Sequence, residues 1–138
     1  MNVGSIMTTN VITVDMDTQL TAICSIFDQN NIHHLPVIDN DEVLGVISDR
    51  DVLKAISPFL DTLAEQKRDL ATLKKRAHQV MSRKPFSISK EASLEEASSM
   101  LIHNNISCLL IISVDGQIEG ILTWKDLLKA YSLLVKVD

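Results

Sequence analysis

Cysteine, glycine and basic charge are all scarce in this chain of 138 residues, and each scarcity excludes a class of protein. The two cysteines, Cys24 and Cys108, are too few for a disulfide framework and lack the spacing of a CxxC or Cys/His metal site. Only four glycines occur, and no glycine run could cradle a triphosphate. The net charge of −5 argues against nucleic acid as a partner, because phosphate backbones select basic surfaces. A local basic pocket for a small anion remains compatible with an acidic protein.

Long apolar runs and targeting signals are missing as well. The longest apolar run, residues 108–112, is far too short to span a bilayer, so we expect no membrane partner. The N-terminus has neither a basic n-region nor an apolar h-region, and together with the few cysteines this predicts a cytoplasmic protein. No Ser/His/Asp set, Cys/His set or HExxH pattern is present, so we expect no enzyme.

The chain contains an internal repeat. A shift of 74 residues places the Asn-Asn-Ile sequence of residues 30–32 on the same tripeptide at 104–106. One inserted residue in the second copy raises the shift to 75, which aligns Asp-Val-Leu-Lys-Ala at 51–55 with Asp-Leu-Leu-Lys-Ala at 126–130. A repeat of this kind predicts two copies of one supersecondary unit.

Each copy is predicted to have the order β-α-β-β-α. In the first helix, Leu20, Ile23 and Phe27 fall at i, i+3 and i+7, which is one apolar helical stripe. Ser93 and Glu96 form a capping-box pattern at the start of the matching helix. The Asn-Asn pairs that follow suit left-handed helix ends. We therefore expect an α/β (α+β) fold, with strands at residues 11–14, 35–38, 43–47, 86–88, 109–112 and 118–122.

The segment between the copies differs from both. Proline disfavours a helix at the residue before it, so Ser57-Pro58 is expected to end the first copy. Residues 59–79 contain no glycine or proline and mix acidic with basic residues, which predicts one connecting helix with a solvated face. The expected division is a first repeat at 1–57, a connecting helical segment at 58–79 and a second repeat at 80–138.

One motif occurs in both copies. A strand ends, a hydroxyl residue (Ser48 or Thr123) opens a helix, and an aspartate (Asp51 or Asp126) follows three residues later. Two interpretations are open. Ser/Thr-x-x-acid is a helix capping box, although glutamate or glutamine is the usual partner. A carboxylate also has two acceptor oxygens, which suit the diol of a ribose.

Taken together, these features resemble a tandem pair of cystathionine-β-synthase (CBS) domains, also called a Bateman module. The resemblance rests on residues 11–14, residues 33–39 and the two motifs, and it covers about residues 3–56 and 77–131. The stretch from His34 to Pro58 is similar to the CBS part of acetoin-utilisation proteins. The resemblance implies two repeats packed around a pseudo-two-fold axis, with two clefts in which the motif aspartate holds the ribose of a nucleotide.

The resemblance also implies the residues of both clefts. The basic pair His33-His34 corresponds to Ser107-Cys108 in the second copy, so the clefts are expected to differ where a phosphate lies. The same histidines also fit a helix end, and Arg83 also fits a solvated loop. The first cleft is assigned Ser48, Asp51, Val80, Arg83, Lys84 and Phe86, and the second Thr8, Ile12, His33, His34, Thr123 and Asp126.

The implied function is a regulatory module that senses AMP, ADP, ATP, S-adenosylmethionine or a dinucleotide, with no required cofactor or metal. The alternative is a structural protein-interaction module with empty clefts. A homodimer with an unidentified effector protein is expected, because the final helix of each copy carries more apolar positions than its own sheet can bury. These positions are Val52, Leu53, Ile56, Leu127, Leu128 and Tyr131.

Overall fold

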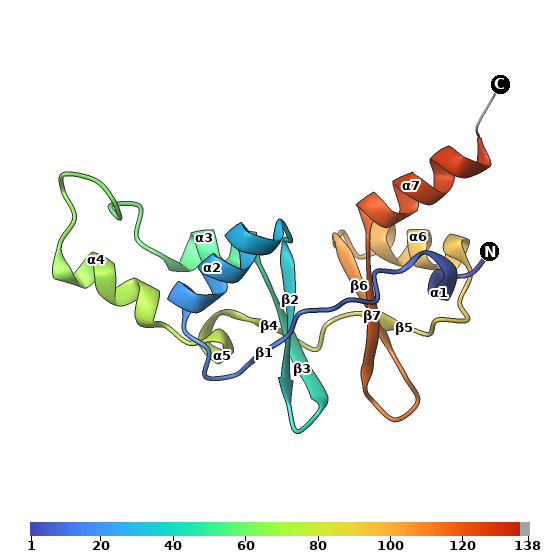
Figure 1. The fold of residues 1–138 in the computed structure, drawn as a ribbon, viewed down its shortest axis with the longest axis horizontal. Coiled ribbons are helices and arrows are strands. Elements are labelled where there is room, and N and C mark those ends of the chain that lie inside the picture. The colour runs from blue at the N-terminus through green and yellow to red at the C-terminus, as the bar shows by residue number, and fades with distance from the viewer. Residues whose placement is uncertain (136–138) are drawn as a thin grey trace. The chain divides into compact units, whose positions relative to one another are not determined.

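The computed structural model describes residues 1–135 and contains two β-sheets flanked by helices (Figure 1). This confirms the expected α/β class. The chain forms two compact units, one of which is made of two separate stretches of the sequence. One consists of residues 12–84, and the other combines residues 1–11 with the chain from residue 85 onward. The compact units are thus divided at different points from the repeats expected at 1–57 and 80–138.

The first unit, residues 12–84, is built on a four-stranded sheet of order β1-β2-β3-β4. Strand β1 runs parallel to β2, and the other neighbours are antiparallel. Its core is formed by side chains from the sheet and from helices on it, chiefly Leu20, Ile23, Leu35, Val37, Ile47 and Ala77. Its main elements are β1 (Val14–Asp15), α2 (Leu20–Asn30), β2 (His34–Asp39), β3 (Glu42–Ser48), α3 (Asp49–Ala55), α5 (Ala77–Val80) and β4 (Ser82–Arg83).

The second unit repeats this plan on a three-stranded sheet of order β5-β6-β7. Strand β5 is parallel to β6, and β6 forms an antiparallel hairpin with β7. Its core consists of Val3, Ala97, Leu101, Leu109, Ile111 and Leu122. Its elements are α1 (Val3–Ile6), β5 (Ser87–Ile88), α6 (Leu94–His103), β6 (Cys108–Ile112), β7 (Ile118–Thr123) and α7 (Trp124–Leu134).

The helix ends follow the sequence prediction. Asn31 ends α2 in the left-handed region with φ 51°, and Asn105 adopts φ 52° just after α6. The Ser93 hydroxyl accepts a hydrogen bond from the Glu96 amide at 3.1 Å, as expected for a residue that caps α6. Asparagine is one of the few residues that tolerates the left-handed conformation, so these positions stop both helices at equivalent points.

Each hairpin receives a further backbone partner from a segment outside its own repeat. Strand β4 pairs with β3, with Arg83 opposite Gly45. In the other unit, Thr8 and Ile121 exchange two backbone hydrogen bonds of 2.9 Å. The short helices α1 and α5 precede these segments. The sequence did not predict α1, β4 or the bridge at Thr8, whereas α5 overlaps the end of the helix expected at residues 59–79.

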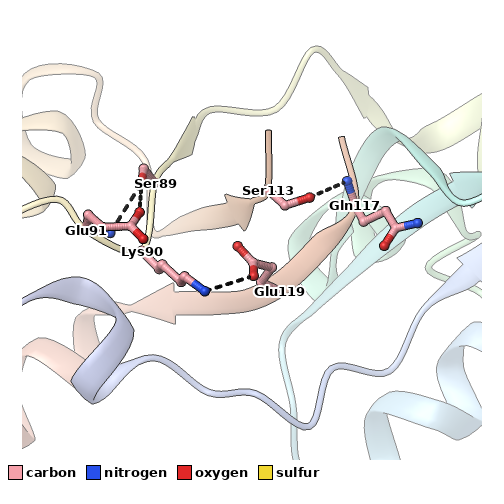
Figure 2. A network of polar contacts seen from close by, with 6 residues as sticks. All are labelled: Ser89, Lys90, Glu91, Ser113, Gln117 and Glu119. Carbon is pink, nitrogen blue, oxygen red and sulfur yellow. Dashed lines mark hydrogen bonds and ion pairs between the residues drawn. The ribbon is translucent and has the colours of Figure 1, made fainter. Parts of the chain in front are cut away.

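Polar contacts hold the turn on which α1 docks (Figure 2). The Lys90 carbonyl accepts a hydrogen bond from the Gly4 amide at 2.8 Å, and the Lys90 ammonium pairs with Glu119 at 3.4 Å. The Ser89 hydroxyl donates to the Glu91 carboxylate, which lowers the pKa of Glu91. Figure 2 also shows the Ser113 hydroxyl accepting from the Gln117 amide at 3.1 Å, across the turn of the β6–β7 hairpin.

The prediction of one connecting helix is wrong. Turns follow Ser57, and the only helices in the segment before α5 are α4 (Lys67–Ala71) and a 3-10 turn (Thr72–Lys74). The cause is Asp69, which is buried and accepts hydrogen bonds from the Ser57 hydroxyl and the Gln66 amide, both at 2.7 Å. Such side-chain bonds compete with a continuous helix. They also tie the segment to the end of α3.

The expected apolar surface of α3 and α7 needs one correction. Val52 is 4% exposed and belongs to the core, so it offers no surface for a partner. Ile56 and Leu127 are partly buried against the cores of their own units. Leu53, Leu128 and Tyr131 are exposed as expected.

Within residues 1–135, every helix is too short or too polar to cross a bilayer.

Candidate functional site

The first motif lies where β3 passes into α3. The Asp51 carboxylate accepts a hydrogen bond from the Ser48 amide through Oδ2 at 2.9 Å, and the Ser48 hydroxyl accepts one from the Asp51 amide at 3.0 Å. The capping interpretation is therefore confirmed. Capping uses only one carboxylate oxygen, and no residue among 1–135 donates a hydrogen bond to Oδ1 of Asp51. The second acceptor needed for a diol is still available.

In the second motif the aspartate again accepts from the amide of the hydroxyl residue, and two side-chain hydroxyls also donate to its carboxylate. Oδ2 of Asp126 accepts from the Thr123 amide at 2.9 Å and from its hydroxyl at 3.3 Å. Oδ1 accepts a hydrogen bond from the Thr8 hydroxyl at 3.2 Å. Thr8 corresponds to Ser82 under the 74-residue shift. The structure thus brings together Thr8, Thr123 and Asp126, three residues that the sequence assigned to one cleft.

A pocket of about 400 Å³ opens beside Asp51 within the unit of residues 12–84. This volume lies within the usual range of small-molecule sites, about 300–1,000 Å³. Two of the residues predicted for the first cleft, Asp51 and Val80, line it. The other lining residues are Lys54, Ala55, Lys75 and Gln79.

Sequence reasoning did not assign Lys54, Lys75 or Gln79 to the site. Lys54 follows Asp51 by three residues on α3, and residues at that spacing share a helix face, so its position was available as a signal. Lys75 and Gln79 carried no such signal, because the segment that holds them was expected to be a solvated helix. The half-buried Lys75 ammonium instead donates to the Ala55 carbonyl at 2.7 Å, which fixes it beside α3.

The predicted basic pair Arg83-Lys84 lies further along the sheet. Arg83 is opposite Gly45, three residues before Ser48, and its guanidinium donates to the His78 carbonyl at 3.3 Å. Lys84 follows the strand in a left-handed conformation with φ 56°. Phe86 belongs to the other compact unit and is partly exposed. The assignment of these three residues to a cleft stays a prediction.

The two histidines lie at the start of β2, in the unit that holds Asp51. His33 Nδ1 lies 2.8 Å from the Asp49 carboxylate, and both side chains are largely exposed. Burial lowers the pKa of His34, as does His33, whereas Asp49 and Asp51 oppose the shift. The lowered pKa favours the neutral form of the His34 ring. Ile12 lies in the same unit, and the role of all three residues at the Asp126 cleft stays a prediction.

Among the described residues, no group of three or more histidine, cysteine, aspartate or glutamate side chains is arranged to hold a metal ion.

A family model decides the identity of the repeats. The CBS domain model matches residues 3–58 and 77–133, once for each copy of the motif. The chain belongs to the CBS domain family. A CBS domain-containing protein of Dictyostelium discoideum is 34% identical over 137 residues, which cover 98% of this chain and 92% of that protein.

Solved CBS structures share the fold. A Vibrio cholerae protein assigned to acetoin utilization (AcuB) has a TM-score of 0.80 at 23% identity, over 99% of this chain and 93% of that one. CBSX2, solved in complex with AMP, has a TM-score of 0.79 at 24% identity and covers 96% and 97% of the two chains. The CBS domain pair of protein MJ0100, solved with 5′-methylthioadenosine and S-adenosyl-L-methionine, has a TM-score of 0.81 at 21% identity, with coverage of 97% and 98%. The resemblance seen in the sequence is confirmed for family and fold.

Proposed function

We propose that this chain is a regulatory CBS pair that binds an adenosine-containing small molecule, with the ribose held by Asp51 or Asp126. The observation that carries the proposal is the geometry of the two aspartates. Each accepts the hydrogen bond of the capping box through Oδ2, while Oδ1 accepts from the Thr8 hydroxyl in Asp126 and from no described residue in Asp51. A capping residue needs one acceptor, whereas a ribose diol can occupy further lone pairs of the same carboxylate.

Two further observations support this function. The pocket beside Asp51 has the volume of a small-molecule site. Two structures of the same fold were solved with AMP and with S-adenosyl-L-methionine, which share the adenosine group. The candidate ligands are AMP, ADP, ATP, S-adenosylmethionine and dinucleotides. The proposal includes no catalytic step, and the small number of cysteines favours the cytoplasm as the compartment.

A melting scan with these adenosine compounds tests the proposal, with GMP as the base control. A ligand at 100 times its dissociation constant stabilises the folded state by about 2.7 kcal/mol, which raises Tm by several degrees. If no adenosine compound changes Tm, the interaction module with empty clefts is the better description.

Calorimetry on Asp51→Asn then tests the ribose contact. Asparagine keeps an oxygen that can cap α3 but loses the charge and one acceptor, so binding should weaken by about 1.5–3 kcal/mol. Asp49→Asn is the matched control, since Asp49 lies in the same helical turn and outside the residues that line the pocket. Equal affinities of both variants and the parent protein for every ligand would remove Asp51 from the site.

A homodimer is the second part of the proposal. Trp124, Leu128 and Tyr131 lie at i, i+4 and i+7 of α7 and are all exposed, which makes one apolar stripe on this helix. Such a stripe favours a two-fold contact with a second copy. Light scattering should give about twice the chain mass of 15.3 kDa. Leu128→Glu should return the mass to that of one chain, and a monomeric parent protein would refute the dimer.

A further inference from the structure

The two motif aspartates differ in how many hydrogen bonds they already accept. Within residues 1–135, the Asp51 carboxylate accepts one, from the Ser48 amide to Oδ2 at 2.9 Å. The Asp126 carboxylate accepts three from the same part of the chain. The amide and the hydroxyl of Thr123 donate to Oδ2 at 2.9 and 3.3 Å, and the Thr8 hydroxyl donates to Oδ1 at 3.2 Å. Both aspartates are half-buried, so they differ in their partners and not in their exposure.

The number of accepted hydrogen bonds decides what each aspartate can still bind. A carboxylate has about four lone-pair sites, two on each oxygen, and a ribose diol needs two of them because each hydroxyl donates one hydrogen bond. Asp51 retains about three sites, including both on Oδ1. Asp126 retains about one, on Oδ1. A diol can therefore bind Asp126 in full only after it displaces a hydroxyl of the protein.

Thr8 is held beside Asp126 by its backbone, independently of its hydroxyl. Its amide donates to the Ile121 carbonyl, and its carbonyl accepts from the Ile121 amide, both at 2.9 Å. The side chain is β-branched, which restricts rotation about χ1. The hydroxyl therefore reaches Oδ1 at little further cost in conformational entropy, whereas a ligand loses translational and rotational freedom when it binds.

The other unit has a hydroxyl at the equivalent position that makes no such contact. Ser82 is opposite Val46 in the β3–β4 pair, as Thr8 is opposite Ile121. The two pairs are related by the shifts of 74 and 75 residues. Among residues 1–135, no hydrogen bond joins the Ser82 hydroxyl to Asp51. Equivalent backbone positions thus leave the two aspartates with different partners.

We propose that Thr8 is a specificity-determining residue, whose hydroxyl occupies Oδ1 of Asp126 and restricts ribose binding to Asp51. The protein then binds one adenosine ligand per chain, in the pocket beside Asp51. This inference rests on the proposed function, because it decides which of the two aspartates holds the ribose. Thr8 was assigned from the sequence as a contact for the ligand of the second cleft, and here it is the group that keeps the ribose from that aspartate.

Calorimetry with AMP, ATP and S-adenosylmethionine, which share the ribose diol, tests the inference. The parent protein should bind one ligand per chain, and Asp51→Asn should weaken that event about tenfold or more. Thr8→Val removes the hydroxyl but keeps the shape of the side chain, and it should add a second binding event per chain. Asp126→Asn combined with Thr8→Val should weaken the second event about tenfold or more. Ser82→Ala is the matched control and should leave the single event of the parent protein unchanged.

The outcomes separate this inference from the proposed function. If the parent protein binds none of the three compounds, the proposed function fails and this inference fails with it. If the parent protein binds two ligands per chain, or if Thr8→Val still binds only one, this inference alone is overturned. Thr8→Val should melt close to the parent protein, because its side chain is exposed and both backbone bonds to Ile121 remain. The number of ligands bound by the parent protein tests the inference even where a variant does not fold.

Discussion

Gly45 is the position where one added methyl group should do the most damage. A Cβ at Gly45 would lie 2.6 Å from the Ser82 carbonyl oxygen and 2.8 Å from the Met81 sulfur, against an ordinary contact of 3.4–4 Å. Strand β4 would have to move away from β3 to make room. Overpacking of this kind destabilises a protein by about 1–3 kcal/mol. We expect the cost of Gly45→Ala to lie near the upper end of this range, because the nearest atom is a backbone oxygen that cannot rotate away.

Gly120 is the matched comparison, since it occupies the same place in the other unit. A Cβ there would meet the Met7 sulfur at 2.5 Å, but the nearest backbone atom, the Thr8 oxygen, lies 3.0 Å away. A thioether can adopt another rotamer, so Gly120→Ala should cost about 1 kcal/mol.

Urea denaturation and thermal melting should rank the two glycine variants. Gly45→Ala is expected to lower Tm by about 6–12 °C, and Gly120→Ala by about half as much. Hydrogen exchange should show the loss of protection at β3 in the first variant and at β7 in the second. If Gly45→Ala lowers Tm by the same amount as Gly120→Ala or by less, the backbone contact with β4 does not determine the loss of stability.

Three further predictions follow from burial, titration and backbone conformation. Leu63 is fully exposed, so Leu63→Ser should change the free energy of unfolding by less than about 0.5 kcal/mol, whereas Leu35→Ser, at 0% exposure, should cost about 2–5 kcal/mol in the same urea assay. Hydrogen bonds from Ser57 and Gln66 lower the pKa of Asp69 below its ordinary 3.8, so its contribution is present above that pH and is lost as the pH falls through the folded-state value. The stability gap between the parent protein and Asp69→Asn should therefore narrow below pH 3.8, and a gap that widens on acidification would contradict this assignment. Asn31→Ala should cost about 1 kcal/mol because of its left-handed backbone, while Asn31→Gly should be neutral or stabilising, and thermal melts of the two variants check the order.

Local patterns predicted the elements that depend on neighbouring residues. The apolar stripe of residues 20–27 forms α2, and the Asn-Asn pairs end α2 and α6 where expected. The Ser/Thr-x-x-Asp motifs cap α3 and α7. Each of these features is decided within one or two helical turns, which is why a single sequence was enough to predict them.

The failures concern residues whose burial depends on distant partners. Nothing near Asp69 in sequence indicates that it is buried, because its hydroxyl donor is Ser57, twelve residues earlier. Val52 and Leu53 are adjacent and equally apolar, yet only Val52 points into the core. Lys75 enters the pocket because its ammonium reaches the Ala55 carbonyl, twenty residues away. Periodicity assigns a face to a helix but does not say which segment covers that face.

The exchange of short segments between the repeats shows why the pocket could be assigned only in part. In one unit the amides of Ala77 and His78 bind the carbonyls of Thr18 and Met16, at 2.8 and 3.1 Å. In the other, the amides of Val3 and Gly4 bind the carbonyls of Ala92 and Lys90, at 2.9 and 2.8 Å. All four pairs of residues are related by the same 74-residue shift.

Each docking segment would therefore satisfy either hairpin equally well by backbone bonding alone. Because the two copies are equivalent in sequence pattern, the repeat alone does not predict which copy supplies the segment that packs on each hairpin. The consequence is chemical, because the two segments carry different side chains. Residues 75–84 bring basic charge to Asp51, whereas residues 1–10 bring Thr8 and no charged side chain to Asp126. Two aspartates at the start of equivalent helices thus lie beside segments of different charge.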